Sequence, residues 1–412
     1  MSLNDHPKAY GTAAIAAAFT AGVLLTLGFK DLYPDLESRY QHEDNDSPSR
    51  RLSKAWNRRS SFFWRAPRAL GRAGSMHRQH PLIEIHSLSK ATGRVILAKA
   101  EFLNGAGNSP KDRGDTIYEG TVGSTGISLA TLARAKGYKA HICMPDDQAF
   151  EKSDLLLHLG ATVERVAVAP ITSPDHFVNL ARRRAMEHTK SSTDGSKGFF
   201  ANQFESEANW QAHVNGTGPE IYQQTGGNLD AFVAGAGTGG TISGVARYLK
   251  LEAKMSSTSN LKVVLADPQG SGLYNKVKYG IMYSPTEREG TRRRQQVDSI
   301  VEGVGVNRVT QNFEAGRDLI DDAVRVTDEQ ACRMARWLVE HDGIFVGSSS
   351  CVNCVAAVAT AMTLPPGSRV VTLLCDPGTR HLSKFYRRIK EMGLEGKEAT
   401  NLFEELGIPE TE

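Results

Sequence analysis

The chain has 412 residues, of which 40% are hydrophobic, and its formal net charge is +3 at pH 7. This length and composition allow a sizeable core and two compact lobes, which excludes a disordered or fibrous protein. So small a net charge gives no argument for a nucleic-acid partner. Five cysteines scattered through so long a chain are unlike a disulfide framework and indicate a reducing compartment.

The N-terminal region contains an uncharged apolar run of 20 residues, Tyr10–Phe29, between Lys8 and Lys30. A helix of this length can cross a bilayer, so we expect residues 1–30 to form a membrane anchor. A cleaved signal peptide is the alternative, but the run is longer and its N-terminal flank less charged than such peptides usually are.

Residues 31–80 are expected to form a disordered, solvated linker, with contact to an anionic membrane surface as the alternative. Asp31 to Asp46 is acidic, whereas Ser47 to Ile83 contains no carboxylate and nine lysine or arginine residues. The positive-inside rule places that basic side, and the large domain after it, in the cytosol. A short apolar helix before a large domain resembles the signal-anchored proteins of the mitochondrial outer membrane, and the endoplasmic reticulum is the competing address.

From Pro81 onward, short apolar runs alternate with helical stretches, which is typical of an α/β domain with mainly parallel sheets. We therefore expect one large domain over residues 81–412. The predicted strands are Arg94–Lys99, Ala140–Met144, Ala231–Ala234, Leu261–Ala266 and Arg369–Leu374. The predicted helices are Gly126–Lys136, Ser153–Leu159, Glu207–Gln224, Gly240–Leu251 and Asp328–Glu340.

The first chemical motif is Phe102–Arg113, with the sequence FLNGAGNSPKDR, where a flexible loop delivers Lys111. A partly desolvated lysine can lose its proton and form a Schiff base with an aldehyde. Taken alone, Lys111 would be interpreted as a surface residue.

The second motif is Glu119–Ala130, EGTVGSTGISLA, where a small-residue loop precedes an amphipathic helix. Backbone donors and the hydroxyls of Thr121, Ser124 and Thr125 could hold a carboxylate. An ordinary helix N-cap is the alternative.

The third motif is Phe232–Tyr248, FVAGAGTGGTISGVARY, where a strand runs into a glycine cluster that opens a helix. Such a turn presents backbone N–H groups that suit a phosphate. Gly235, Gly237 and Gly240 also satisfy the GxGxxG pattern of dinucleotide sites, for which Asp267 would be the ribose ligand. A purely structural tight turn also remains open.

The fourth motif is Gly343–Ala357, GIFVGSSSCVNCVAA, which predicts an apolar strand, three serines and a small-residue helix. A serine hydroxyl here could meet a heteroaromatic nitrogen without imposing a charge, and a plain helix start is the alternative. Cys351 and Cys354 stand at the helix start, where thiol acidity would be raised. Without a second pair, zinc is not expected, and buried packing is favoured over redox regulation.

Taken in order, these motifs resemble the fold type II pyridoxal-phosphate (PLP) enzymes of the cysteine synthase and cystathionine β-synthase group, over roughly Pro81 to Tyr386. The resemblance implies a two-lobed fold with the smaller lobe at roughly 111–225, and it implies that Lys111 carries the cofactor. The phosphate would be cradled by Gly237, Thr238, Gly239, Gly240 and Thr241, and the ring would contact Ser124 and Ser349. The substrate would be held by Thr121, Val122, Gly123, Thr125, Gln203 and Gly303, with no metal involved.

The resemblance also implies the reaction, a transferase-type β-replacement that makes L-cysteine from O-acetylserine and sulfide through an aminoacrylate. Homodimers are the usual assembly of such enzymes. Cystathionine β-synthase and serine/threonine dehydratase share the same cofactor residues, and a membrane-bound relative without catalysis is a further alternative. A dinucleotide dehydrogenase would leave Lys111 and the serine cluster unexplained.

Three departures from the family pattern mark a divergent branch. Relatives usually have some twenty residues of helix and loop after the lysine motif, whereas here Arg113 is followed almost at once by the next strand. A genuine deletion and an incorrectly joined gene both explain this gap. Ser124 replaces the usual asparagine and Val122 the usual serine, and the lysine loop is one residue longer, with Pro110 beside the lysine.

Overall fold

The computed structural model describes residues 82–100, 115–255, 260–282, 299–394 and 399–409. The chain divides into two units, Met1–Gly74 and Ser75–Glu412, and every described residue belongs to the second. The predicted anchor of residues 1–30 and the linker of residues 31–80 lie outside the described residues and stay predictions. Among the residues that are described, no helix combines the length and the apolar character needed to cross a membrane.

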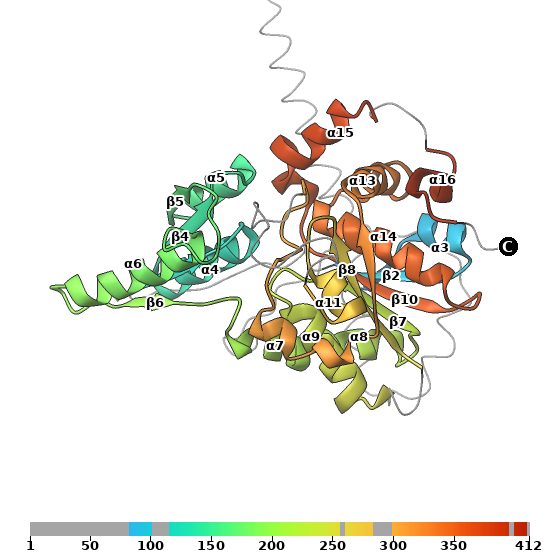
Figure 1. Ribbon diagram of the computed structural model, residues 1–412, viewed down its shortest axis with the longest axis horizontal. Coiled ribbons are helices and arrows are strands. Elements are labelled where there is room, and N and C mark those ends of the chain that lie inside the picture. Colours follow the sequence, from blue (N-terminus) through green and yellow to red (C-terminus); the bar gives the residue numbers. More distant parts are fainter. Residues whose placement is uncertain (1–81, 101–114, 256–259, 283–298, 395–398, 410–412) are drawn as a thin grey trace, which may run out of the picture. The chain divides into compact units, whose positions relative to one another are not determined.

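The larger of two sheets has six strands in the order β1-β2-β10-β7-β8-β9 (Figure 1). All neighbours are parallel except β1, which is antiparallel to β2. The strands are β1 (Leu82–Glu84), β2 (Val95–Ala100), β7 (Ala231–Gly235), β8 (Lys262–Pro268), β9 (Asp322–Val326) and β10 (Arg369–Leu374).

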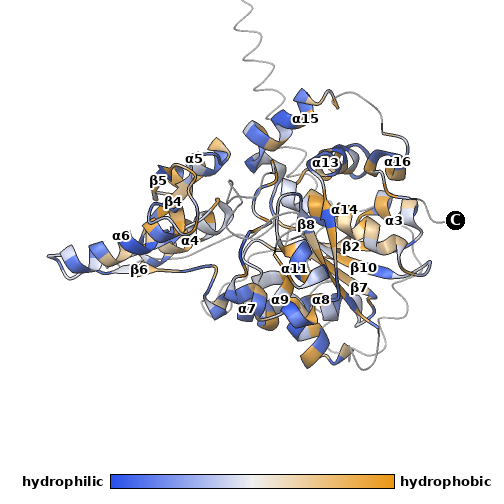
Figure 2. Ribbon diagram, viewed as in Figure 1, coloured by the Kyte–Doolittle hydropathy of each residue, from blue (hydrophilic) through white to orange (hydrophobic). Residues whose placement is uncertain are grey.

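Helices bury their apolar sides on both faces of this sheet. One face packs against α3 (His86–Thr92), α13 (Asp328–Asp342), α14 (Ser348–Met362), α15 (Arg387–Glu391) and α16 (Leu402–Leu406). The other packs against α8 (Gly218–Thr225), α9 (Gly240–Arg247), α11 (Leu273–Tyr279) and α12 (Gln311–Glu314). Hydrophobic residues concentrate in the strands between these layers, whereas α13 is largely hydrophilic on its outer side (Figure 2). Burial on both faces explains why these strands are nearly continuous apolar runs.

The smaller sheet has four parallel strands in the order β5-β4-β3-β6. They are β3 (Thr116–Gly120), β4 (Lys139–Pro145), β5 (Thr162–Val166) and β6 (Gly198–Phe200). One face packs on α4 (Ser124–Lys136) and α5 (Phe150–His158), and the other on α6 (Phe177–Ser191). The side chains of β4 alternate accordingly: Ile142 and Met144 face α4 and α5, whereas Cys143 faces α6.

The predicted α/β class with mainly parallel sheets is confirmed, and every predicted strand and helix overlaps an observed one except the strand expected just before the serine cluster. The predicted helix Glu207–Gln224 is interrupted, because α7 (Glu207–Ala212) and α8 flank a π-helical segment, His213–Thr217. Both α7 and α8 pack on α9. The predicted end of the smaller lobe at about residue 225 stays a prediction.

The strand predicted just before the serine cluster is wrong. Val346 forms only an isolated bridge with Pro377. The two hydrogen bonds of this bridge run from Gly347 N–H to Asp376 C=O and from Gly378 N–H to Phe345 C=O, at 2.9 and 3.1 Å. The serine cluster therefore follows a single bridge rather than a strand of the sheet.

A gap opens between the central strands β7 and β10, which pair over only two residues. Beyond them, the Asn353 side chain of α14 accepts from Gly235 N–H at 2.7 Å and donates to Leu373 C=O at 3.0 Å. The chain continues from β7 into α9 on one face and from β10 toward α15 on the other. Open α/β sheets bind ligands at such a switch point, beyond the carboxyl ends of the strands.

We expect Asn353→Ala to lower the free energy of unfolding by about 2–4 kcal/mol, because Gly235 N–H and Leu373 C=O would be buried without partners. Urea denaturation measures this change. Thr360→Val is the matched control on the same helix, since the Thr360 hydroxyl is buried without a partner among the described residues. Equal losses from both substitutions would contradict the bridging role of Asn353.

Candidate active site

A glycine-rich loop leaves β7 at the switch point and enters α9 at Gly240. Gly239 has φ +84°, and a Cβ there would lie 2.6 Å from the Cα of Phe313. A Cβ on Gly237 would lie 2.2 Å from the carbonyl oxygen of Gly303, and one on Gly240 would lie 2.0 Å from Oδ1 of Asn209. Neighbouring segments thus leave no room for side chains, and the backbone itself forms the surface at the positive end of α9.

Side chains from other segments hold this loop in place. Asn209 Nδ2 donates to Thr238 Oγ1 at 3.0 Å, and Thr310 Oγ1 donates to Thr238 C=O at 2.6 Å. Thr241 Oγ1 lies 3.1 Å from His213 Nε2, and burial lowers the pKa of His213 to about 4. His213 is therefore neutral at pH 7, and the loop is fixed without an added charge.

The small-residue loop Thr121–Thr125 joins β3 to α4 at the carboxyl edge of the smaller sheet. Thr121 is buried, and its Oγ1 accepts from Gly123 N–H at 3.2 Å. Gly123 has φ +137° and precedes the first helical residue, Ser124, which is exposed. The first N–H groups of α4 therefore start from a glycine turn, which suits an anionic group.

Gln203 lies beside this loop but is committed to the protein backbone. Its Nε2 donates to Gly120 C=O at 2.7 Å, and its N–H donates to Glu119 Oε2 at 3.1 Å. The backbone carbonyl oxygen of Gln203 accepts hydrogen bonds from the side-chain amides of Asn209 and Asn312, at 2.8 and 2.7 Å. Gln203 thus joins the loop after β3 to the glycine loop through Asn209.

The three serines at the start of α14 have different partners. Ser348 Oγ accepts from Glu302 N–H at 3.0 Å, and Ser350 Oγ accepts from Cys375 N–H at 2.9 Å. Ser349 is only 4% exposed, yet its hydroxyl bonds to no other residue of the described chain. The Ser349 hydroxyl is therefore available to a ligand atom that accepts or donates one hydrogen bond.

A cavity of about 450 Å³ lies between the carboxyl edges of the two sheets, within the usual size range of ligand sites. Its walls include Val122, Gly237 and Gly303, which the sequence analysis assigned to one site, together with Phe177 and Phe204. The other predicted site residues that the structure describes do not line the cavity. They are neighbours of the lining residues in the sequence, or they are linked to them by the hydrogen bonds described above. Lys111 lies outside the described residues.

Five polar residues that support the site were not predicted: Glu119, Asn209, His213, Thr310 and Asn312. Asn209 belongs to the segment NQFESEANW that contains Gln203, but nothing in the local pattern distinguishes it. Each of them bonds to a residue of the site that lies 28 to 109 positions away along the chain. Such contacts leave no periodic signal in a single sequence.

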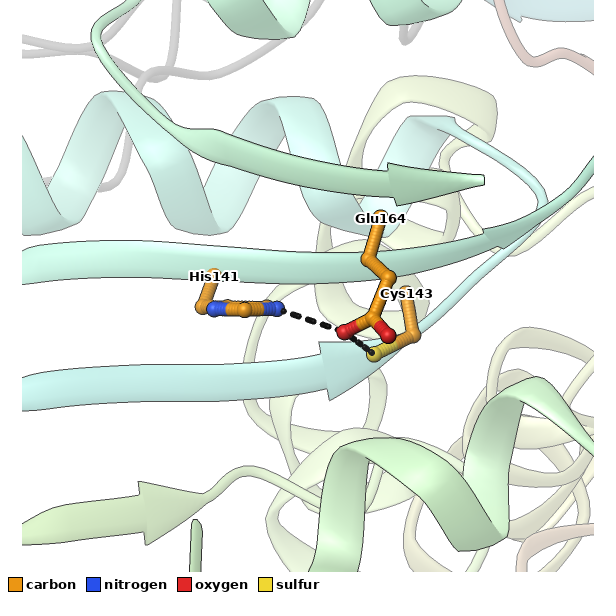
Figure 3. Close-up of side chains that lie close together, drawn as sticks. All are labelled: His141, Cys143 and Glu164. Atoms are coloured by element: carbon orange, nitrogen blue, oxygen red, sulfur yellow. Dashed lines mark hydrogen bonds and ion pairs between the residues drawn. The ribbon is translucent and has the colours of Figure 1, made fainter. Parts of the chain in front are cut away.

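A separate group of possible ligand side chains lies on the α6 side of the smaller sheet, where His141 and Cys143 of β4 face Glu164 of β5 (Figure 3). Their nearest ligand atoms lie within 4.8 Å of one another. Arg184 already binds both oxygens of Glu164, at 2.9 and 3.2 Å, and burial raises the pKa of the Cys143 thiol to about 12. We interpret the group as a structural ion pair; the expectation of no metal stays a prediction.

Two alternative assignments lose support. Cys351 and Cys354 are fully buried, and burial raises the pKa of both thiols, so the expected increase in acidity is wrong. Desolvation outweighs the helix N-terminus. Asp267, the suggested ribose ligand, is buried, and its Oδ2 accepts from Tyr274 N–H at 2.7 Å in the first turn of α11. The structure therefore gives this carboxylate a helix-capping role.

Comparison with known proteins agrees with this geometry. The model of the pyridoxal-phosphate dependent enzyme family matches residues 75–376. A cysteine synthase 2 from Neurospora crassa is 64% identical over 461 aligned positions, covering 100% of this chain and 99% of that protein. The crystal structure of an O-acetylserine dependent cystathionine beta-synthase from Helicobacter pylori superposes with a TM-score of 0.59 at 30% identity, covering 76% of this chain and 99% of that one.

The predicted location at the mitochondrial outer membrane, with the catalytic domain facing the cytosol, is contradicted. A relative from Saccharomyces cerevisiae is 53% identical over 76% of this chain and 83% of its own, and its name assigns that protein provisionally to the mitochondrion, as a cysteine synthase. That name mentions no membrane.

The Neurospora alignment is longer than the 412 residues of this chain, so that relative contains segments this chain lacks. The family match covers more than half of the chain, and the relative shares its sequence from end to end. The chain therefore belongs to the pyridoxal-phosphate-dependent enzymes, in the group that contains the fungal cysteine synthases.

Proposed function

We propose that the protein is a PLP-dependent cysteine synthase that replaces the acetate of O-acetylserine with sulfide to give L-cysteine. The observation that carries this proposal is the 64% identity to a cysteine synthase along practically the whole of both chains. The solved relative from Helicobacter pylori is described as O-acetylserine dependent, which supports the choice of the activated serine. The family's usual homodimer is part of the proposal, and sedimentation velocity tests it.

The described residues fit the cofactor. The backbone of Gly237, Thr238, Gly239, Gly240 and Thr241 would hold its phosphate at the start of α9, and the uncommitted Ser349 hydroxyl would meet the ring nitrogen. When bound, the cofactor supplies an electron sink at the substrate Cα. A neutral hydroxyl does not force a proton onto the ring, so the sink is moderate and suits elimination and replacement rather than transamination.

The smaller lobe would hold the amino-acid carboxylate. In this proposal the first N–H groups of α4 and the hydroxyls of Thr121 and Thr125 donate to it, with Val122 and Gly123 shaping the turn, whereas Ser124 would contact the cofactor ring. Gln203 orients the chain at Gly120, and Gly303 lies on the wall of the cavity through which substrate enters. Lys111 would bind the cofactor covalently and, once displaced, take the Cα proton.

Lys111→Ala should abolish the visible absorbance of cofactor bound through the lysine and lower kcat by at least about 100-fold, because it removes both the attachment and the base. Absorbance spectra and steady-state cysteine formation measure the two effects. Lys136→Ala is the control, because Lys136 is exposed in the last turn of α4. Unchanged cofactor absorbance in Lys111→Ala would overturn the assignment.

The choice of substrate pair can be tested with the wild-type protein. We expect kcat/KM for O-acetylserine with sulfide to exceed that for serine with homocysteine by at least about 100-fold, or about 3 kcal/mol in transition-state binding. The reverse preference would indicate cystathionine β-synthase, and pyruvate or 2-oxobutyrate release would indicate a dehydratase. A colourless protein that ignores amino acids would instead favour the relative without catalysis.

Glu119 provides a pH test of the carboxylate site. Burial raises the pKa of Glu119 to about 7, although Gln203 and Gly120 N–H groups oppose the shift. Below pH 7 the Glu119 carboxyl group is neutral. Above pH 7 it is ionised, and its negative charge lies next to the loop that would bind the negatively charged substrate carboxylate. The affinity for L-serine should therefore fall as pH rises from 6 to 8, relative to Glu119→Gln, in which this position cannot ionise. Parallel pH profiles for the two proteins would contradict this role.

A further inference from the structure

A buried ion pair joins α5 of the smaller lobe to the loop before Gly303. Lys152 Nζ lies 2.5 Å from Glu302 Oε2, and the two side chains are 2% and 1% exposed. Ala149 N–H also donates to Glu302 Oε1 at 3.1 Å. Charges this deeply buried persist only when paired and hydrogen-bonded, so these contacts define one fixed arrangement of the two segments.

Each partner of the pair touches a different part of the candidate active site. The Lys152 stem lies under the carboxylate loop, since a Cβ on Gly123 would be 2.5 Å from Lys152 Cδ. Glu302 immediately precedes Gly303, and its N–H donates to Ser348 Oγ, next to Ser349. The pair thus connects the loop that would hold the carboxylate to the segments that would face the cofactor.

The surroundings of Glu302 keep it charged. Lys384 Nζ lies 3.4 Å from Oε1, and His381 Nδ1 lies 3.5 Å from Oε2, while Asp376 binds the other ring nitrogen of His381 at 2.8 Å. Burial raises the pKa of Glu302, but the charges of Lys152, Lys384 and His381 outweigh it, and the pKa lies below its ordinary value. The contact is therefore ionic at neutral pH.

We propose that the Lys152–Glu302 pair is a positioning element for substrate binding, which sets residues 121–125 at the separation from the larger lobe that an amino-acid carboxylate requires. The inference rests on the carboxylate role proposed above for this loop. Hydrogen bonds that hold the phosphate loop come from Asn209, Thr310 and Gly305, and none of these bonds involves the side chain of Lys152 or Glu302. Loss of the pair should therefore weaken recognition of the carboxylate and spare the phosphate.

Binding of two related ligands to the cofactor-loaded enzyme separates positioning from general damage. L-serine and ethanolamine share an amine and a hydroxyl, and only serine has the carboxylate. We expect Lys152→Met and Glu302→Gln each to raise the Kd of serine by about tenfold or more, with the Kd values of ethanolamine and of the cofactor within about twofold of wild type. Glutamine has nearly the same size as glutamate and keeps one hydrogen-bond acceptor in the side chain. Glu302→Gln can therefore be used for the test if Lys152→Met does not fold.

Lys250→Met is the matched control, because it breaks a Lys250–Asp321 pair, 2.5 Å long, within the larger lobe. It should leave the ratio of the two Kd values unchanged. The double variant Lys152→Met/Glu302→Gln should lose less serine affinity than the two single losses combined, since both charges act through one contact.

Two results would overturn the proposal in distinguishable ways. In the first, the wild-type enzyme prefers serine, but both single variants raise the Kd values of serine and ethanolamine by the same factor. The pair would then have only a structural role, and the proposed function would stand. A wild-type enzyme that binds the two ligands equally well would remove the carboxylate role of residues 121–125, and the positioning role with it.

Discussion

The site depends on the separation of β7 from β10 in the middle of a buried parallel sheet. Ladder bonds hold these strands together at one end, and the Asn353 amide replaces them at the other. A buried backbone group without a partner is costly, so the strands can diverge only because a side chain satisfies Gly235 and Leu373. The glycine loop leaves β7 at this gap, and the start of α14 bonds to the chain just after β10 through Ser350 and Cys375, so the proposed phosphate loop and Ser349 lie at the same edge of the sheet.

Local chemistry made much of this predictable. Gly237, Gly239 and Gly240 stand out in the sequence because a strand, a glycine cluster and a helix follow one another, and the structure shows neighbouring atoms where their side chains would be. The serine cluster could be located in the same way. The resemblance to the PLP enzymes had already assigned Ser349 to the cofactor ring, and the structure adds that Ser348 and Ser350 bond to the backbone of other segments.

The features that could not be predicted depend on contacts between distant segments or on the degree of burial. Lys152 and Glu302 are 150 positions apart, and each alone looks like a surface charge. The acidity expected for Cys351 followed from its place at a helix start, but full burial has the larger effect on a thiolate. Val346 sits in an apolar run that suits a strand, yet it forms only a single bridge, with Pro377.

The central claim is that one cofactor spans the gap, with its phosphate on the backbone of residues 237–241 and its ring nitrogen at Ser349. A crystal structure of the protein with pyridoxal phosphate bound tests this most directly. We expect phosphate oxygens within hydrogen-bond distance of N–H groups in that loop, and the Ser349 hydroxyl within about 3 Å of the ring nitrogen. A phosphate bound elsewhere, or a ring nitrogen facing another side chain, would contradict it.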